Sequence, residues 1–136
     1  MEREQEELIR ADLATAASKL DTAELLQREG KAADSISRSY YAVFHAATAL
    51  MRAEGLKPTS HRGLKTLLGL HFAKPGLIAT DLAKSFERLQ EQRENSDYDN
   101  FVSYDADDSA KALADAKAFV VAARALVTGK FGVRLE

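Results

Sequence analysis

The chain has 136 residues, of which 46% are hydrophobic, so it is long enough for one domain with a buried core. Its 19 basic and 21 acidic residues give a net charge of −2, which argues against broad, non-specific polyanion binding but permits a local basic site. Cysteine is absent, which excludes disulfides and thiolate chemistry, and no apolar run approaches the ~18 residues of a membrane span. The charged start, MEREQEELIR, lacks the apolar core of a signal peptide, so we expect a soluble cytoplasmic protein.

Two long helices are predicted in the first half of the chain, because apolar residues recur there every three or four positions. The first spans about residues 4–29 and ends at Gly30, and its early glutamates suit the positive end of a helix dipole. The second spans about 32–54 and ends at Gly55, and its wide apolar stripe predicts a central position. The residues of that stripe are Ala33, Ile36, Tyr40, Phe44, Ala47 and Met51, with Tyr41 and Thr48 beside them.

Three further helices are predicted in the second half. A short helix spans about 60–73, with Ser60 as its N-cap, and the next helix begins near Thr80. The last helix begins near Asp105, and its alanine-rich seam suits close packing against a neighbour. The loop between the last two helices, 96–104, is polar, acidic and aromatic, which makes it the most informative connection in the chain.

These elements predict a single all-α domain over residues 1–136. Short connections favour antiparallel neighbours, so the expected fold is a five-helix antiparallel bundle with its core over about 4–128. The last residues, 129–136, form a short tail that we expect to fray.

Arg93 interrupts the apolar face of the fourth predicted helix. Leu82, Phe86 and Leu89 set a stripe that the guanidinium continues four residues later. Because an unpaired guanidinium is costly to bury, Arg93 must either pair with an acceptor such as Asp97, one turn later, or reach a cleft. Arginine keeps its charge and can bind a phosphate through two nitrogens, so a cleft that holds an anion is the second expectation.

The three histidines do not have the spacing of metal ligands and no glycine-rich phosphate loop is present, so neither a metal nor a cofactor is predicted. His61 lies beside a predicted helix start, where anions are attracted. His45 shares a stripe of the second helix with Arg38, Tyr41 and Arg52. That stripe fits either a polar seam or a solvated face, and we favour the solvated face.

Four blocks of sequence are distinctive in combination: DSISRSYYAVFHAATALMRAEG, SHRGLKTLLGLHF, LQEQRENSDYDNF and the alanine-rich last helix. Together they resemble the HEPN superfamily (higher eukaryotes and prokaryotes nucleotide-binding), in its branch of small stand-alone prokaryotic proteins, over about residues 8–127. The resemblance implies an all-α bundle that forms homodimers. It also implies that active members are metal-independent ribonucleases, often toxins paired with a minimal nucleotidyltransferase antitoxin. Their motif, an arginine and a histidine separated by about four to six residues, faces its own copy across the dimer cleft.

On this resemblance Arg93 matches the motif arginine, but the motif histidine is absent. After the four residues that follow Arg93 the chain has Tyr98, and no histidine occurs beyond His71. A tyrosine titrates near pH ~10 and is a poor base at neutral pH, whereas histidine suits cleavage at a ribose hydroxyl. In some related systems the nucleotidyltransferase adenylylates a tyrosine near the motif, which makes Tyr98 and Tyr104 the modification candidates here. We expect Tyr104 to pack against the bundle.

The expected function is therefore that of a binding module. Arg93, Asp97 and His61 would hold the phosphate of a nucleotide or an RNA in the cleft of a homodimer that acts with a nucleotidyltransferase. The alternative is a metal-independent ribonuclease toxin that uses Arg93 with Tyr98 or His61. A second alternative is a non-catalytic structural bundle in which Arg93 belongs to a satisfied ion pair.

Overall fold

The computed structural model describes residues 1–98 and 102–135. Within these ranges the chain forms five α-helices and one π-helical turn, and no strand, which confirms the all-α prediction. The elements are α1 (Arg3–Arg28), α2 (Ala32–Glu54), α3 (His61–Leu68), η1 (Gly69–Ala73), α4 (Thr80–Tyr98) and α5 (Ala106–Gly129). None of the helices in the described ranges combines the length and the apolar composition that a bilayer crossing requires.

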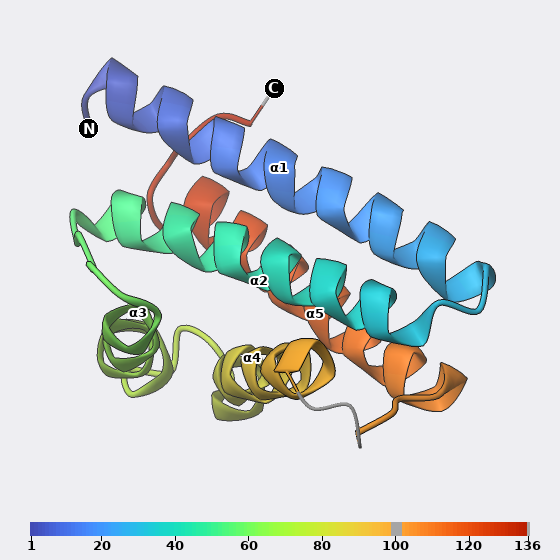
Figure 1. Cartoon of the computed structure of the whole chain (residues 1–136). Helices are drawn as coiled ribbons and strands as arrows, with labels where there is room; N and C mark the ends of the chain where they lie inside the picture. The colour runs from blue at the N-terminus through green and yellow to red at the C-terminus, as the bar shows by residue number, and fades with distance from the viewer. Residues whose placement is uncertain (99–101, 136) are drawn as a thin grey trace.

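The helix α2 is the centre of the fold, as its wide apolar stripe predicts. Figure 1 shows α1 and α2 as an antiparallel pair, with α5 behind α2, while α3 and α4 are seen nearly end-on and so run across that layer. The α1–α2 contact is the most extensive, and α2 also contacts α3, α4 and α5. Taken together, the residues of α2 therefore contact every other α-helix of the described ranges.

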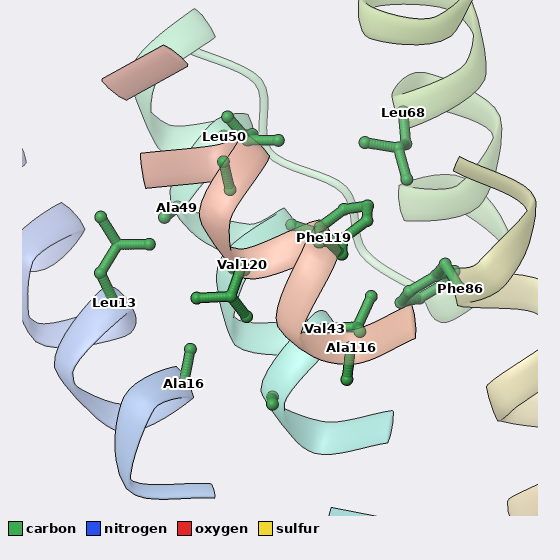
Figure 2. Close-up of a cluster of buried hydrophobic side chains, with 14 of the residues drawn as sticks. Leu13, Ala16, Val43, Ala49, Leu50, Leu68, Phe86, Ala116, Phe119 and Val120 are labelled. Carbon is green, nitrogen blue, oxygen red and sulfur yellow. The ribbon is translucent and has the colours of Figure 1, made fainter. Parts of the chain in front are cut away.

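The core lies between α2 and the helices around it. Figure 2 shows Leu13 of α1, Val43 and Leu50 of α2, Phe86 of α4 and Phe119 of α5 gathered in one cluster. All five side chains are almost fully buried. Buried alanines of α2 and α5 leave room for close helix packing, and the aromatic rings fill the wider spaces toward α3 and α4.

Local signals set most of the helix ends. The residue after α2, Gly55, has φ of 76°, a left-handed conformation in which glycine is favoured. Ser60 caps α3 as predicted, because its hydroxyl accepts from the backbone N–H of Gly63 at 2.9 Å. Asp105 and Asp108 form a reciprocal capping box at the start of α5, and the backbone N–H of Asp108 lowers the pKa of the Asp105 carboxyl.

Two sequence-based predictions are wrong: the start of the loop after α4 and the fraying of the tail. The loop predicted over 96–104 starts too early, since α4 continues to Tyr98, whereas residues 99–101 lie outside the described residues. The tail predicted to fray is packed against the bundle. Val133 is 1% exposed and its N–H donates to the carbonyl of Val127 at 3.0 Å, while Arg10 of α1 donates to the carbonyl of Arg134 at 2.9 Å. Burial of its apolar side chains explains why the tail is held.

Candidate functional site

Arg93 lies on the inner side of α4, where the stripe places it, against two tyrosines of α2. Its carbon Cζ is 5.3 Å from the ring centroid of Tyr40 and 5.3 Å from that of Tyr41. A cation over an aromatic face at this distance is attracted by the ring, by about 0.5–2 kcal/mol according to how far it is desolvated. The rings of two successive residues on α2 therefore hold the last turns of α4.

The guanidinium of Arg93 also forms an ion pair with Asp97, which is one of the two arrangements expected from the sequence. Arg93 Nη1 donates to Asp97 Oδ2 at 3.1 Å, and the side chains of Arg93 and Asp97 are 19% and 43% exposed. This pair does not satisfy the whole group, because Arg93 Nε is buried and has no acceptor among the described residues. A buried donor without an acceptor is uncommon and costs about 1–3 kcal/mol. The ion pair and the two rings thus fix the guanidinium of Arg93 in place but leave its Nε donor without an acceptor in the described residues.

His61 joins the same cluster through Tyr40. As the first residue of α3, His61 places its Nδ1 in hydrogen-bonding contact with the Tyr40 hydroxyl, and its ring lies 4.9 Å from the ring of Phe44. Burial raises the pKa of Tyr40 well above that of a free tyrosine, although the nearby Arg93 charge opposes the shift. Tyr40 thus keeps its proton at neutral pH and connects α3, through His61, to α4, through Arg93.

A family model described as the HEPN domain matches residues 9–126, most of the chain and all of the residues placed around Arg93. The chain belongs to the HEPN family.

Named proteins align with much of this HEPN chain. A UPF0332 protein of Thermotoga maritima is 29% identical over 124 residues, which cover 91% of this chain and 94% of that relative. A UPF0332 protein of Pyrococcus horikoshii is 48% identical over 65 residues, a match that covers 48% of this chain and 46% of that relative. A protein of Methanocaldococcus jannaschii, named as a candidate toxin, is 32% identical over 92 residues, or 68% of this chain and 69% of that relative.

Tyr98, where the resemblance leads us to expect a motif histidine, faces away from Arg93. Because each residue of a helix is rotated by about 100° from the one before it, side chains five residues apart point in directions that differ by roughly 140°. Consistent with that, Tyr98 is 81% exposed, whereas Arg93 is turned inward. Tyr104 is partly buried and packs against the core, as expected. The two tyrosines near the motif therefore differ sharply in how accessible they are.

The stripe that contains His45 and Arg52 is a polar seam, so our preference for a solvated face was wrong. Arg52 Nε donates to Asp12 Oδ2 at 2.6 Å, and His45 Nδ1 is 4.0 Å from Asp12 Oδ1. Partial burial lowers the pKa of His45, and the charge of Asp12 opposes that shift. The seam therefore joins α1 to α2. The other two residues of the stripe are Tyr41, which contacts Arg93, and Arg38, which is partly buried.

An open cavity of about 670 Å³ lies beside His61, between the first turns of α1, the end of α2 and the connection to α3. Its floor is apolar, with Phe44, Met51 and Leu64 among the lining residues, and His61 forms part of its wall. The volume is within the ~300–1,000 Å³ range of small-molecule pockets. Within the described residues, no group of three or more potential ligand side chains is placed to hold a metal ion.

Tyr40 and Tyr41 are the site residues that sequence reasoning missed. Their apolar stripe predicted them as core, and Tyr40 is indeed fully buried. The available signal was the doublet itself within SRSYYAVFH, because two successive residues on a helix point about 100° apart and can enclose a group between them. Periodicity alone did not indicate that Arg93 would be that group.

Proposed function

We propose that this HEPN protein is the toxin-like member of a pair with a minimal nucleotidyltransferase and that it binds the phosphate of a nucleotide or an RNA at Arg93. The family and the relative named as a candidate toxin support the toxin-like role. The observation that supports the binding site is the held guanidinium of Arg93, which has two aromatic rings beneath it, one carboxylate partner and a buried Nε without an acceptor in the described ranges.

A phosphate suits this arrangement better than a neutral ligand does. The charge of Arg93 is permanent, and its planar fork matches two oxygens of a phosphate. The side chain of Asp97 is 43% exposed, so its carboxylate can rotate away from Arg93 when a phosphate binds there. Because the rings of Tyr40 and Tyr41 already fix the guanidinium, little side-chain entropy is lost on binding. The net charge of −2 is compatible with this because the site is local.

Arg93→Ala should weaken the binding of a fluorescein-labelled single-stranded RNA by about 10- to 100-fold, because a charge-assisted hydrogen bond is worth ~1.5–3 kcal/mol. Fluorescence anisotropy at one fixed salt concentration measures the change. Arg93→Lys keeps the charge but loses the fork and should give an intermediate affinity. Arg88→Ala is the matched control, since Arg88 is on the same helix and is engaged by Asp81 and Asp115. It should alter the affinity by less than about twofold.

Affinity that is the same in wild type and Arg93→Ala would contradict the proposal and would favour the structural bundle. Thermal melts of every variant must accompany the titrations, because Arg93 packs on two core rings and its loss lowers stability as well. A variant that is folded at the assay temperature and does not bind supports the site.

The proposed cleft requires two copies of the chain, with an interface that includes the end of α4 and the residues after it. Tyr98, a large side chain that is 81% exposed at that end, is compatible with a surface that a second copy covers. Multi-angle light scattering at micromolar concentration should give twice the mass of one chain. A monomer would rule out the composite cleft and would leave one separate Arg93 site on each molecule.

A nucleotidyltransferase partner would find Tyr98 and not Tyr104 accessible for adenylylation. Tyr98 is 81% exposed, whereas Tyr104 packs against the core. Incubation with a candidate nucleotidyltransferase and ATP, followed by peptide mass mapping, should place any adenylyl group on Tyr98, and Tyr98→Phe should abolish the signal. An adenylyl group on Tyr104 in folded protein would contradict this assignment.

A metal-independent ribonuclease is the second candidate, and the observation that favours it is the shared contact of Arg93 and His61 with Tyr40. The version that uses Tyr98 is disfavoured, because Tyr98 faces away from Arg93. The labelled RNA should be incubated with the protein and a metal chelator and then analysed for fragments. Cleavage that is lost in both Arg93→Ala and His61→Ala would establish the enzyme, and intact RNA would favour binding alone.

A further inference from the structure

Tyr40 makes two different contacts with the two charged or titratable groups of the site. The face of its ring lies under Arg93, with 5.3 Å between Cζ and the ring centroid, and its hydroxyl contacts His61 Nδ1. The ring is further fixed by neighbouring rings, at 5.1 Å from Tyr41 and 5.8 Å from Phe86. Tyr40 itself is fully buried, whereas its bond to His61 is partly buried.

The Tyr40 hydroxyl must be the donor in its bond with His61. If His61 Nδ1–H donated instead, the tyrosine proton would need another acceptor, and no other partner of this hydroxyl is present in the described ranges. A buried hydroxyl without an acceptor is unfavourable. Burial also raises the pKa of Tyr40, so the proton stays on the hydroxyl at neutral pH. His61 Nδ1 is then the acceptor, and the proton of the neutral ring is on Nε2.

The remaining ring nitrogen of His61 is therefore a donor. His61 forms part of the wall of the open cavity of about 670 Å³, so the ring is reachable from outside while Tyr40 holds it from inside. Phe44, at 4.9 Å from the His61 ring, limits its rotation. A held imidazole with its proton on Nε2 presents one N–H to an oxygen or nitrogen acceptor of a bound ligand.

We propose that Tyr40 is the positioning residue of the RNA site: it holds His61 as the tautomer whose Nε2–H donates to the bound RNA, and it supports Arg93 with its ring. This inference rests on the proposed function for its ligand, although the fixed tautomer of His61 stands independently of that ligand. Tyr40 touches no RNA itself and acts through the two side chains that it holds.

The tautomer is tested first, by two-dimensional ¹H–¹⁵N NMR of the histidine rings in the full-length protein at about pH 8, where a histidine is neutral. Wild type should show a bare Nδ1 and a protonated Nε2 for His61. Tyr40→Phe keeps the ring and removes the hydroxyl, so the His61 signals should shift toward a mixture of tautomers, while those of His71 stay unchanged. His61→Gln assigns the signals. A proton on Nδ1 in wild type, or identical His61 signals in Tyr40→Phe, would overturn the proposal.

RNA binding is then measured in a double-mutant cycle. Tyr40→Phe should weaken binding by about 3- to 10-fold, and His61→Ala by at least as much, as expected for one hydrogen bond. In the His61→Ala background, Tyr40→Phe should have no further effect, because the hydroxyl acts only through His61. Independent, additive losses would show that Tyr40 has only a structural role and would overturn the positioning claim.

The outcomes separate this inference from the proposed function. A wild-type protein that binds no RNA would refute the function, and with it the ligand assigned to His61 Nε2, while the NMR result would still decide whether Tyr40 fixes the tautomer. RNA binding that depends on Arg93 but is unchanged in Tyr40→Phe would uphold the function and refute the positioning role of Tyr40.

Discussion

Replacement of Phe119 with alanine should lower the free energy of unfolding by about 3–5 kcal/mol, the range for large-to-small changes at fully buried aromatic positions. Figure 2 shows Phe119 extending from α5 toward Leu68 of α3 and Phe86 of α4, and its exposed fraction is 0%. The ring therefore fills the space between the layer of long helices and the two helices that cross it. Its truncation leaves a cavity that neighbours from three elements would have to close.

Urea denaturation followed by far-ultraviolet circular dichroism measures the loss. Val121→Ala is the matched control, because Val121 is two residues away on the same helix and is 67% exposed. It should change stability by less than ~0.5 kcal/mol. A loss below about 1 kcal/mol for Phe119→Ala would mean that α3 and α4 close the gap easily and that this ring does not join the two layers.

Val133→Asp should lower the free energy of unfolding by about 2–4 kcal/mol, the largest effect that we expect from the segment after α5. Val133 is 1% exposed, and its N–H is bonded to the carbonyl of Val127. A carboxylate there must either be buried without a partner or pull the tail off the bundle. If the tail detaches, the loss in the free energy of unfolding cannot exceed the free energy that holds the tail on the bundle.

Detachment of the tail in Val133→Asp can be detected separately, since a detached tail is cleaved by proteases while the helices stay intact. Limited proteolysis with mass spectrometry should therefore accompany the denaturation curves. Val121→Asp places the same charge on an exposed site and should be nearly neutral. A fully stable Val133→Asp protein with a protected tail would show that burial of the Val133 side chain is not what holds the tail on the bundle.

The helices could be predicted from the sequence because their signals are local. Gly55 ends α2 and Ser60 caps α3 within a few residues of the predicted positions, and both depend on chemistry inside one turn. The end of α4 was misjudged because Asn95, Ser96 and Asp97 are weak helix formers. The Arg93–Asp97 ion pair spans that last turn and supports it, an effect that propensity does not include.

The candidate site could be predicted only in part, since its contacts join residues far apart in the chain. Arg93 was identifiable from its place in an apolar stripe. The contact of Tyr40 with His61 spans 21 residues, and that of Asp12 with Arg52 spans 40, so both depend on how three helices meet. The tail was misjudged for the same reason, because Arg10 of α1 donates to the carbonyl of Arg134, a contact that spans 124 residues.

The outward direction of Tyr98 offers a practical route to an optical reporter. The chain contains no tryptophan, so Tyr98→Trp would introduce a single indole whose emission can be excited selectively. At 81% exposure the larger ring disturbs no core contact, and it lies little more than one turn from the guanidinium. Quenching of that emission would then follow the arrival of a nucleic acid or a second subunit at the end of α4 in real time, without a dye attached to either molecule.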